Sequence, residues 1–293
     1  MKPLSTGHIM HHTQVTLLGT KGGPAIRPGT RMPTSLLIQM DGMTVLVDAG
    51  LGVSRALCDA GMALTDLDAI LITHLHSDHY LELGPLLHTA WTAGLNTPIA
   101  IYGPEGLTQY WDSFLQAMSF DIELRLRDEG RPALAPLAQI HVLNTGDMAL
   151  GSLQVKVMRN THPPIIDSFA LRIEGQEHSV VLSGDTAPME EMVSFAQGAD
   201  LLVHEAMLSA GIDALCARVG NGDDRLRLHL ERSHTPAAEA GRIAKDAGVA
   251  RLALNHLVPC DDPDFTEAHW QEETRCTWDG PLFIGTDGMT ISL

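Results

Sequence analysis

The sequence predicts an α/β fold in which two β-sheets pack face to face and helices cover their outer sides. Short apolar runs alternate with turn residues and helical patterns in both halves of the chain. Each half is rich in strand candidates with helices interspersed, which favours two packed sheets over a single doubly wound sheet. No linker, repeat or low-complexity tract separates the halves. We therefore expect one domain over residues 1–293, with 1–13 as a mobile N-terminus.

In the first half, strands are expected where short apolar runs lie between turn residues. These segments are 14–18, 35–40, 44–48, 69–73, 99–102, 140–143 and 154–158. Segment 69–73 is apolar on both faces, which places it at the centre of its sheet. Apolar residues recur at helical spacing in 53–60, 81–93 and 105–118, which predicts three helices.

The second half repeats this rhythm. Strands are expected at 169–173, 179–183, 201–204, 251–255, 281–284 and 289–292, and helices at 189–196, 212–219 and 236–247. The last helix has Thr235 as its expected N-cap, Pro236 at its first position and Gly248 as its stop.

Composition and charge exclude several classes of protein. No apolar run approaches the length of a membrane-spanning helix, and the first residues lack the apolar stretch of a secretory signal. The four cysteines form no CxxC pair, so we expect reduced thiols and a cytoplasmic location. Nineteen Lys and Arg against 36 Asp and Glu give a net charge of −17. Such a surface repels phosphate backbones, so we expect no nucleic-acid partner and no membrane partner.

The most informative segment follows the central strand and reads Thr73-His74-Leu75-His76-Ser77-Asp78-His79. Side chains in a loop at the end of a buried strand are well placed for chemistry. His74 and His76 can bind one metal ion, while Asp78 and His79 can bind a second about 3.5 Å away. These ligands suit two borderline divalent cations, for which zinc is expected and manganese or iron are alternatives.

This motif resembles that of the metallo-β-lactamase superfamily, whose four-layer αββα sandwich of two mixed β-sheets flanked by helices matches the predicted layers. The resemblance runs from about Val15 to Met289. It implies that a His, a bridging Asp and a final His follow later strands, and His162, Asp185 and His256 stand at such positions. The implied ligands are His74, His76 and His162 for the first metal, Asp78, His79 and His256 for the second, and Asp185 between them. Asp48 resembles the buried Asp that braces the ligand loop in this family.

Two further segments resemble the ribonuclease Z branch of the superfamily. His204-Glu205-Ala206 is similar to its His-Glu-Ala segment, and Ser233-His234-Thr235 is similar to its His-Ser/Thr-Thr helix. The resemblance implies that Glu205 orients His234, which protonates the leaving oxygen or holds the scissile phosphoryl group. Asp78, Glu205 and His234 are therefore the expected catalytic residues, with Asp78 as the proton acceptor.

The expected function is hydrolysis by a hydroxide that bridges the two metals and attacks phosphorus or sulfur. True ribonuclease Z carries a long basic Gly- and Pro-rich arm between its Tyr-Gly-Pro segment, here Tyr102-Gly103-Pro104, and its third His. No such arm can be identified here, since Arg125, Arg127 and Arg131 are interspersed with acidic residues. We therefore expect a small phosphodiester or aryl sulfate-type ester as substrate, and a homodimer by analogy with these relatives.

Two alternatives stay open at this point. The first is a lactone or β-lactam hydrolase of the same fold, which would not need the Glu205 and His234 pair. The second is a non-catalytic metal-binding sensor or assembly protein. The loop Gly19-Thr20-Lys21-Gly22-Gly23 could approach a phosphate, although such glycine-rich loops are more often simple turns.

Overall fold

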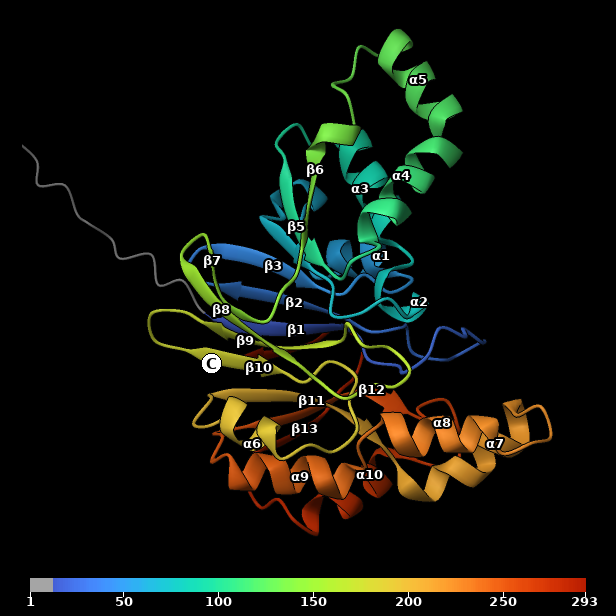
Figure 1. The fold of residues 1–293 in the computed structure, drawn as a ribbon, viewed down its shortest axis with the longest axis vertical. Coiled ribbons are helices and arrows are strands. Elements are labelled where there is room, and N and C mark those ends of the chain that lie inside the picture. Colours follow the sequence, from blue (N-terminus) through green and yellow to red (C-terminus); the bar gives the residue numbers. More distant parts are fainter. Residues whose placement is uncertain (1–12) are drawn as a thin grey trace, which may run out of the picture.

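The computed structural model describes residues 13–293, in which two seven-stranded β-sheets pack face to face between outer layers of helices (Figure 1). This confirms the α/β sandwich predicted from the sequence. The predicted mobile N-terminus lies outside the described residues except for Thr13, which is buried and accepts a hydrogen bond from the backbone N–H of Leu293. None of the described helices is long and apolar enough to cross a bilayer.

The first sheet has the strand order β14-β1-β2-β3-β4-β5-β6. Strands β14, β1, β2 and β3 pair in antiparallel fashion, and β3 to β6 run parallel. Their bounds are β1 Gln14–Gly19, β2 Ser35–Met40, β3 Met43–Val47, β4 Ala69–Leu71, β5 Ile99–Gly103, β6 Ala138–Val142 and β14 Met289–Ser292.

The second sheet has the order β13-β12-β11-β10-β9-β8-β7. Strands β7 to β10 are antiparallel, and β10 to β13 are parallel. The bounds are β7 Gly146–Leu150, β8 Leu153–Arg159, β9 Phe169–Glu174, β10 Ser179–Leu182, β11 Leu201–Met207, β12 Leu252–Val258 and β13 Leu282–Ile284. The chain thus builds one sheet, then the other, and returns through β14 to the first.

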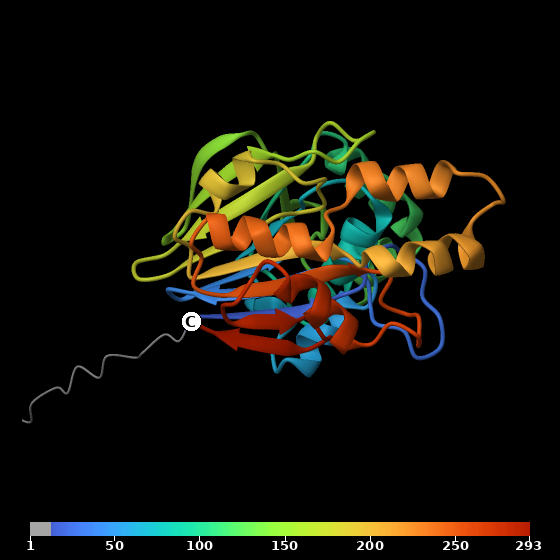
Figure 2. The same cartoon turned by 90° about the horizontal axis from the view of Figure 1, so that it is seen from below.

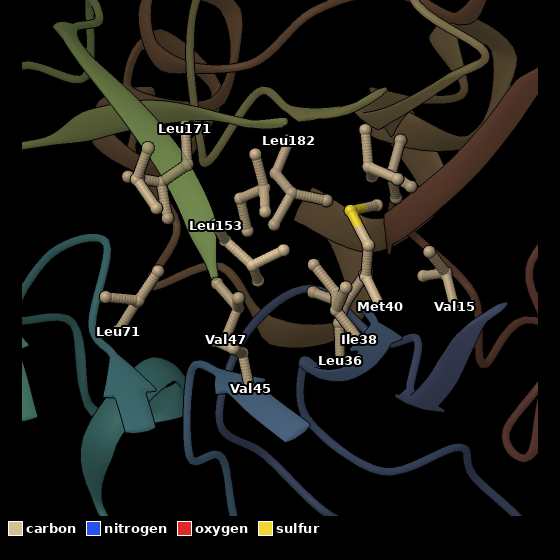
Figure 3. Packing of buried hydrophobic residues seen from close by; sticks show 14 of the residues in the cluster. Val15, Leu36, Ile38, Met40, Val45, Val47, Leu71, Leu153, Leu171 and Leu182 are labelled. Carbon is tan, nitrogen blue, oxygen red and sulfur yellow. The ribbon is translucent and has the colours of Figure 1, made fainter. Parts of the chain in front are cut away.

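The central core lies between the two sheets. Figure 3 shows Leu36, Ile38 and Met40 of β2 directed toward Leu153 and Leu182 of the second sheet. Successive side chains of a strand point to opposite faces. Leu37, between Leu36 and Ile38, is buried on the other face of β2, where helices cover the sheet. Burial on both faces explains the near-continuous apolar runs from which the strands were predicted.

Helices cover the outer face of each sheet. The first sheet carries α1 Val53–Asp59, α3 Leu83–Thr92 and α4 Leu107–Ala117, and the second carries α6 Glu191–Phe195, α9 Ala237–Asp246 and α10 Glu267–Arg275. The other helices are α2 Ser77–Tyr80, α5 Ser119–Asp128, α7 Ile212–Val219 and α8 Arg225–Ser233, with short 3₁₀ turns at Leu64–Asp66, Ala135–Leu137 and Ser209–Gly211. Helices α4 and α5 project beyond the first sheet, and α7 and α8 form a pair at one end of the sandwich (Figure 1).

The structure differs from the sequence predictions in a few elements. Strand β7 and helices α2, α5, α8 and α10 were not predicted. Helix α9 begins at Ala237 with Pro236 as its N-cap, one residue later than expected. Thr235 does not cap it, because its hydroxyl donates to the carbonyl of Thr186 at 2.6 Å. Gly248, with a φ of 63°, follows the helix as predicted.

The polar loops of both sheets gather at one end of the sandwich. Residues predicted for the site follow strands β3 and β4 of the first sheet and β8 and β10 of the second within three positions, and two more lie near the ends of β11 and β12. Figure 2 shows α7, α8 and the loop of residues 22–33 at this same end, away from the C-terminus. The fold therefore brings residues far apart in the sequence to one place.

Candidate metal centre

The structure brings the three histidines predicted for a first metal into direct proximity. His76 Nδ1 lies 3.1 Å from His74 Nε2 and 3.0 Å from His162 Nε2. His74 and His76 follow β4 of the first sheet, whereas His162 follows β8 of the second. All three nitrogens and a carboxylate oxygen of Asp185 lie within 4.8 Å of one another, an arrangement that could hold a metal ion.

A second cluster of Asp78, His79 and His256 adjoins the first. Asp78 Oδ2 lies 3.6 Å from His79 Nε2 and 3.3 Å from His256 Nε2. Helix α2 supplies Asp78 and His79, and His256 lies within β12 at a φ of 44°. Such left-handed backbone is unfavourable for residues with a Cβ and is often found at functional sites.

Asp185 lies between the two clusters. It is grouped with the three histidines of the first cluster and, separately, with His256 of the second and His234. Its Oδ2 is 3.3 Å from His79 Nε2 and 3.1 Å from His256 Nε2. The same oxygen is 3.7 Å from His74 Nε2 and 3.8 Å from His162 Nε2. The preceding Gly184 has a φ of 56°, and a Cβ there would lie 2.5 Å from the carbonyl oxygen of Phe169. The tight turn after β10 thus requires glycine and directs Asp185 into the site.

Neighbouring residues hold the histidine rings in one orientation. His79 Nδ1 lies 2.7 Å from Asp48 Oδ2, and Asp48 also accepts a hydrogen bond from the backbone N–H of Thr73 at 2.8 Å. His162 Nδ1 lies 3.0 Å from the carbonyl oxygen of Ser233. Such partners keep the proton on Nδ1 and leave the Nε2 lone pair free for a metal. Asp48 therefore occupies the bracing position that the sequence predicted.

The electrostatics of the site suit cation binding. Burial lowers the pKa of His74, His76 and His162, that of His162 to about 4, so these rings are neutral near pH 7. Burial also disfavours the charged form of Asp185, but His256 and His79 outweigh it and lower the pKa of this carboxyl well below its usual range. Buried carboxylates need compensating positive charge, which divalent cations supply.

The donor set passes a direct test of fit to a metal. Three imidazole nitrogens face one another at distances typical of ligands around one ion. The nitrogen at the centre, His76 Nδ1, carries either one proton or one lone pair, so it cannot form hydrogen bonds with both of the others. In addition, His79 Nε2 is buried and makes no hydrogen bond within the part of the chain that the structure describes. A buried polar atom is rarely left without a partner, so this nitrogen is suited to a bound cation.

Glu205 and His234 lie beside the two clusters. His234 Nδ1 is 3.3 Å from Glu205 Oε1, and this oxygen accepts hydrogen bonds from the backbone N–H groups of Thr186 and Thr235 at 3.1 and 3.0 Å. Burial lowers the pKa of His234, but the Glu205 carboxylate outweighs it and raises this pKa to about 9. His234 is therefore protonated near neutral pH, and its ring lies 5.3 Å from that of His162 and 5.5 Å from that of His256.

The clusters open into a pocket of about 330 Å³. One part of its lining is polar and includes Asp78, Asp185 and His256 together with Lys21 and Arg27. The other part is apolar and comes mainly from the α7 and α8 pair and the end of β12. Its apolar residues include Leu215, Val219, Leu226, Leu230, Val258 and Pro259. A pocket of this size and lining can hold a ligand with one charged and one apolar part.

Sequence reasoning missed His229, which also lines the pocket. Its ring lies 6.2 Å from the rings of His76 and His162 and 6.0 Å from that of His234. His229 belongs to α8, whose Leu226, Leu228 and Leu230 alternate with polar residues as in a strand. Leu226 and Leu230, which face the pocket and the small core beside it, are four residues apart as on one face of a helix. This spacing could have indicated a helix.

The chain is similar to known proteins along most of its length. Residues 13–226 match the family model described as Anti-Pycsar protein Apyc1. A ribonuclease Z of Mycolicibacterium gilvum is 33% identical over 278 residues, which cover 94% of each chain.

Two solved structures share the fold. The metallo-beta-lactamase fold protein YhfI from Bacillus subtilis aligns over 96% of this chain and 99% of its own, with a TM-score of 0.71 and 22% identity. The short form of human tRNase Z aligns over 95% of this chain and 98% of its own, with a TM-score of 0.67 and 23% identity.

These relatives overturn one expectation drawn from the sequence. The predicted small-molecule ester and the absence of a nucleic-acid partner conflict with relatives that are named as ribonucleases along nearly the whole chain. The physical reason is that a net charge of −17 sums the entire surface and does not report the charge at one pocket. Between Pro104 and His162, where ribonuclease Z carries its basic arm, the structure has the projecting helices α4 and α5 (Figure 1).

Proposed function

We propose that this metal-dependent hydrolase, which belongs to the metallo-β-lactamase superfamily, cleaves a phosphodiester bond of RNA. Within the superfamily, the chain belongs to the branch of ribonuclease Z and of the Apyc1 family. The observation that carries the proposal is the pair of His/Asp clusters that share Asp185 Oδ2, with His234 directly beside them. The names of the relatives support RNA as the class of substrate.

In this proposal, His74, His76 and His162 bind one zinc ion, Asp78, His79 and His256 bind a second, and Asp185 is shared. Imidazole and carboxylate ligands are those that zinc takes in hydrolases. When bound, the cations supply a water of lowered pKa and polarise the phosphoryl oxygen. The protein contributes rigid placement of the ligands through Asp48 and the Ser233 carbonyl.

Asp78 is the proposed acceptor of the proton of the attacking water. Its contacts with His79, His256 and the backbone N–H of Gly23 all involve Oδ2 within residues 13–293. No hydrogen bond within the described part of the chain uses the second carboxylate oxygen, and Asp78 lines the pocket. Burial raises the pKa of Asp78, but His79 and His256 outweigh it and lower this pKa, so the carboxylate is ionised near neutral pH.

His234 is the proposed donor of a proton to the leaving oxygen. Glu205 keeps the imidazole protonated and in place, and two backbone N–H groups in turn fix Glu205. A protonated imidazole in a buried pocket can also stabilise the negative charge that develops on the phosphoryl group. The Glu205 and His234 pair favours phosphodiester hydrolysis over the lactone or β-lactam alternative, which does not need such a donor.

The experiment compares four substrates with zinc-loaded protein before and after chelation. The substrates are a transfer RNA precursor, a single-stranded RNA oligonucleotide, bis(p-nitrophenyl) phosphate and p-nitrophenyl sulfate. The proposal predicts chelator-sensitive cleavage of an RNA and of the phosphodiester, both lost in His234→Ala. Cleavage of neither RNA, or faster turnover of the sulfate than of the phosphodiester, would contradict the proposal.

A further inference from the structure

Lys21 is an unusual residue for this protein. It is one of four lysines in a chain of net charge −17, and only 6% of its surface is exposed. A buried ammonium group is costly unless it is paired or fully hydrogen-bonded. Lys21 nevertheless lines the pocket that contains Asp78, Asp185 and His256.

The contacts of Lys21 leave its ammonium group incompletely paired. Nζ donates one hydrogen bond, to the carbonyl oxygen of Gly22 at 2.9 Å, although an ammonium has three N–H donors. Within residues 13–293, no carboxylate oxygen comes within the 4.0 Å of an ion pair with it. Of the three acidic residues in the same lining, Asp261 is paired instead with Arg27 and Arg218, and Asp78 and Asp185 contact the histidines of the two clusters.

The loop that carries Lys21 packs directly onto the metal centre. A Cβ on Gly22 would lie 2.8 Å from His256 Cε1, so the backbone at this position touches the imidazole. The next N–H, that of Gly23, donates to Asp78 Oδ2 at 2.8 Å. Lys21 Nζ lies beside the same Gly23, 3.9 Å from where its Cβ would be. The loop that carries Lys21 therefore contacts this ligand cluster through its backbone, and Lys21 lines the same pocket.

Among the lining residues, the two basic side chains are Lys21 and Arg27. Arg27 is neutralised by Asp261 at 2.8 Å, so Lys21 is the one whose charge is not matched by a carboxylate of the described chain. Much of the remaining wall is apolar and offers no anion. The missing counter-charge is best supplied by an anionic ligand in the pocket.

We propose that Lys21 is a substrate-binding residue that donates a hydrogen bond to a non-bridging oxygen of the scissile phosphoryl group. This inference rests on the proposed phosphodiesterase activity and adds to it a residue outside both ligand clusters and the Glu205 and His234 pair. It also gives the glycine-rich loop a role, because Gly22 and Gly23 allow the backbone to lie against His256 and Asp78 while Lys21 faces the pocket. The group that Lys21 would bind is the monoanion of a phosphate ester.

Three variants test the role of Lys21. Lys21→Met removes the charge and keeps the length of the side chain, and Lys21→Arg keeps a cation. Lys245→Met makes the same charge change at an exposed position of α9 and serves as the matched control. Each zinc-loaded protein is assayed for kcat and KM on bis(p-nitrophenyl) phosphate and for the rise in its unfolding temperature with inorganic phosphate. The second readout does not depend on turnover.

We expect Lys21→Met to lower kcat/KM by roughly 10- to 100-fold, as for the loss of one hydrogen bond to a charged group, and to reduce the stabilisation by phosphate. Lys21→Arg should recover part of both, and Lys245→Met should match the wild type. The inference would be overturned if Lys21→Met had the same kcat/KM and the same stabilisation by phosphate as the wild type. It would also be overturned if a lower kcat/KM in Lys21→Met were explained by a lower zinc content.

The two proposals fail in different ways. If the wild type does not hydrolyse the diester but phosphate stabilises it in a Lys21-dependent manner, the proposed reaction fails and the anion site stands. If the wild type hydrolyses the diester and Lys21→Met does so equally well, the reaction stands and the role of Lys21 is wrong.

Discussion

Asp185 and Asp48 illustrate how single carboxylates organise this site. Asp185 Oδ2 lies within 3.8 Å of four imidazole nitrogens that come from both sheets. Asp48 is in none of the metal-binding groups found among residues 13–293, but its hydrogen bonds to His79 and Thr73 fix the loop that carries His74 and His79. One residue is thus proposed to bind the cations, and the other to hold the ligands in position.

Replacing Asp48 should weaken metal binding without removing a ligand. In Asp48→Asn, His79 loses its charged partner, and such changes typically reduce metal affinity by about 10- to 100-fold. Zinc affinity can be measured by competition with a chromophoric chelator. Asp59→Asn, an exposed carboxylate paired with Arg55 on α1, is the control and should bind zinc like the wild type. Equal affinity in both variants would show that Asp48 does not brace the site.

Replacing Glu205 should impair turnover and leave the bound zinc unchanged. Glu205→Gln keeps the hydrogen bonds to the backbone but removes the charge that raises the pKa of His234. General acid catalysis contributes roughly 10²- to 10⁴-fold, so kcat on a phosphodiester should fall by a factor in that range. Zinc content by mass spectrometry is measured on the same samples. An unchanged kcat would remove the Glu205 and His234 pair from the mechanism.

Helices α7 and α8 form a separately packed wall of the pocket. They bury Ile212 and Leu230 against Met207 and Val258 in a small cluster that is distinct from the three larger cores. Helix α8 carries His229 and ends immediately before His234. Its position therefore determines both the shape of the pocket and the placement of the proposed proton donor.

Truncating Leu230 should destabilise this wall. Leu230 is buried, and Leu230→Ala should lower the free energy of unfolding by about 2–3 kcal/mol, the lower end for buried Leu→Ala changes, because the cluster is small. The same change should reduce kcat, since α8 positions His234. Leu228, on the same helix, is 56% exposed, so Leu228→Ala should change stability by less than about 0.5 kcal/mol. Denaturant unfolding of both variants checks the difference, and equal values would contradict the packing described.

The elements that could be predicted from the sequence are those buried on both faces. Strand β4 consists entirely of buried apolar residues and β2 contains four of them, so their sequences indicate strands directly. Helices α5 and α10 bury only one or two residues each, and little periodicity marks them. Helix α8 has the alternation of a strand, and tertiary packing makes it helical.

The candidate site was predicted more completely than the elements around it. The spacing of His74, His76, Asp78 and His79 indicated metal binding from the residue types themselves, and the resemblance to a family supplied the more distant partners. His229 carries no motif, and the glycine-rich sequence around Lys21 is compatible both with a loop that approaches a phosphate and with an ordinary turn. Their proximity to the site depends on long-range packing of α8 and of the 22–33 loop, which sequence spacing does not report.

At the scale of the whole molecule, the candidate site draws its residues from both sheets. His74, His76, Asp78 and His79 come from the first sheet, and His162, Asp185 and His256 come from the second. Cations bound to both sets would link the two sheets. Ligands that bind only the folded state stabilise it, by about 2.7 kcal/mol when their concentration is 100 times the dissociation constant.

Metal removal should therefore lower the unfolding temperature of the entire sandwich. Calorimetry of zinc-loaded and chelated protein should show a lower midpoint after chelation, which zinc restores. The shift should be smaller in Asp48→Asn at the same zinc concentration, because its affinity is lower. An unchanged midpoint after verified zinc removal would show that the clusters do not couple the two sheets.

The most direct test of the central claim is turnover of bis(p-nitrophenyl) phosphate measured against the number of zinc ions bound per chain. The proposed site, with Asp185 shared between two clusters, predicts that activity rises with zinc, reaches its maximum at two ions per chain and disappears on chelation. Full activity after complete chelation, or none at any zinc occupancy, would contradict the proposal that this centre is a phosphodiesterase.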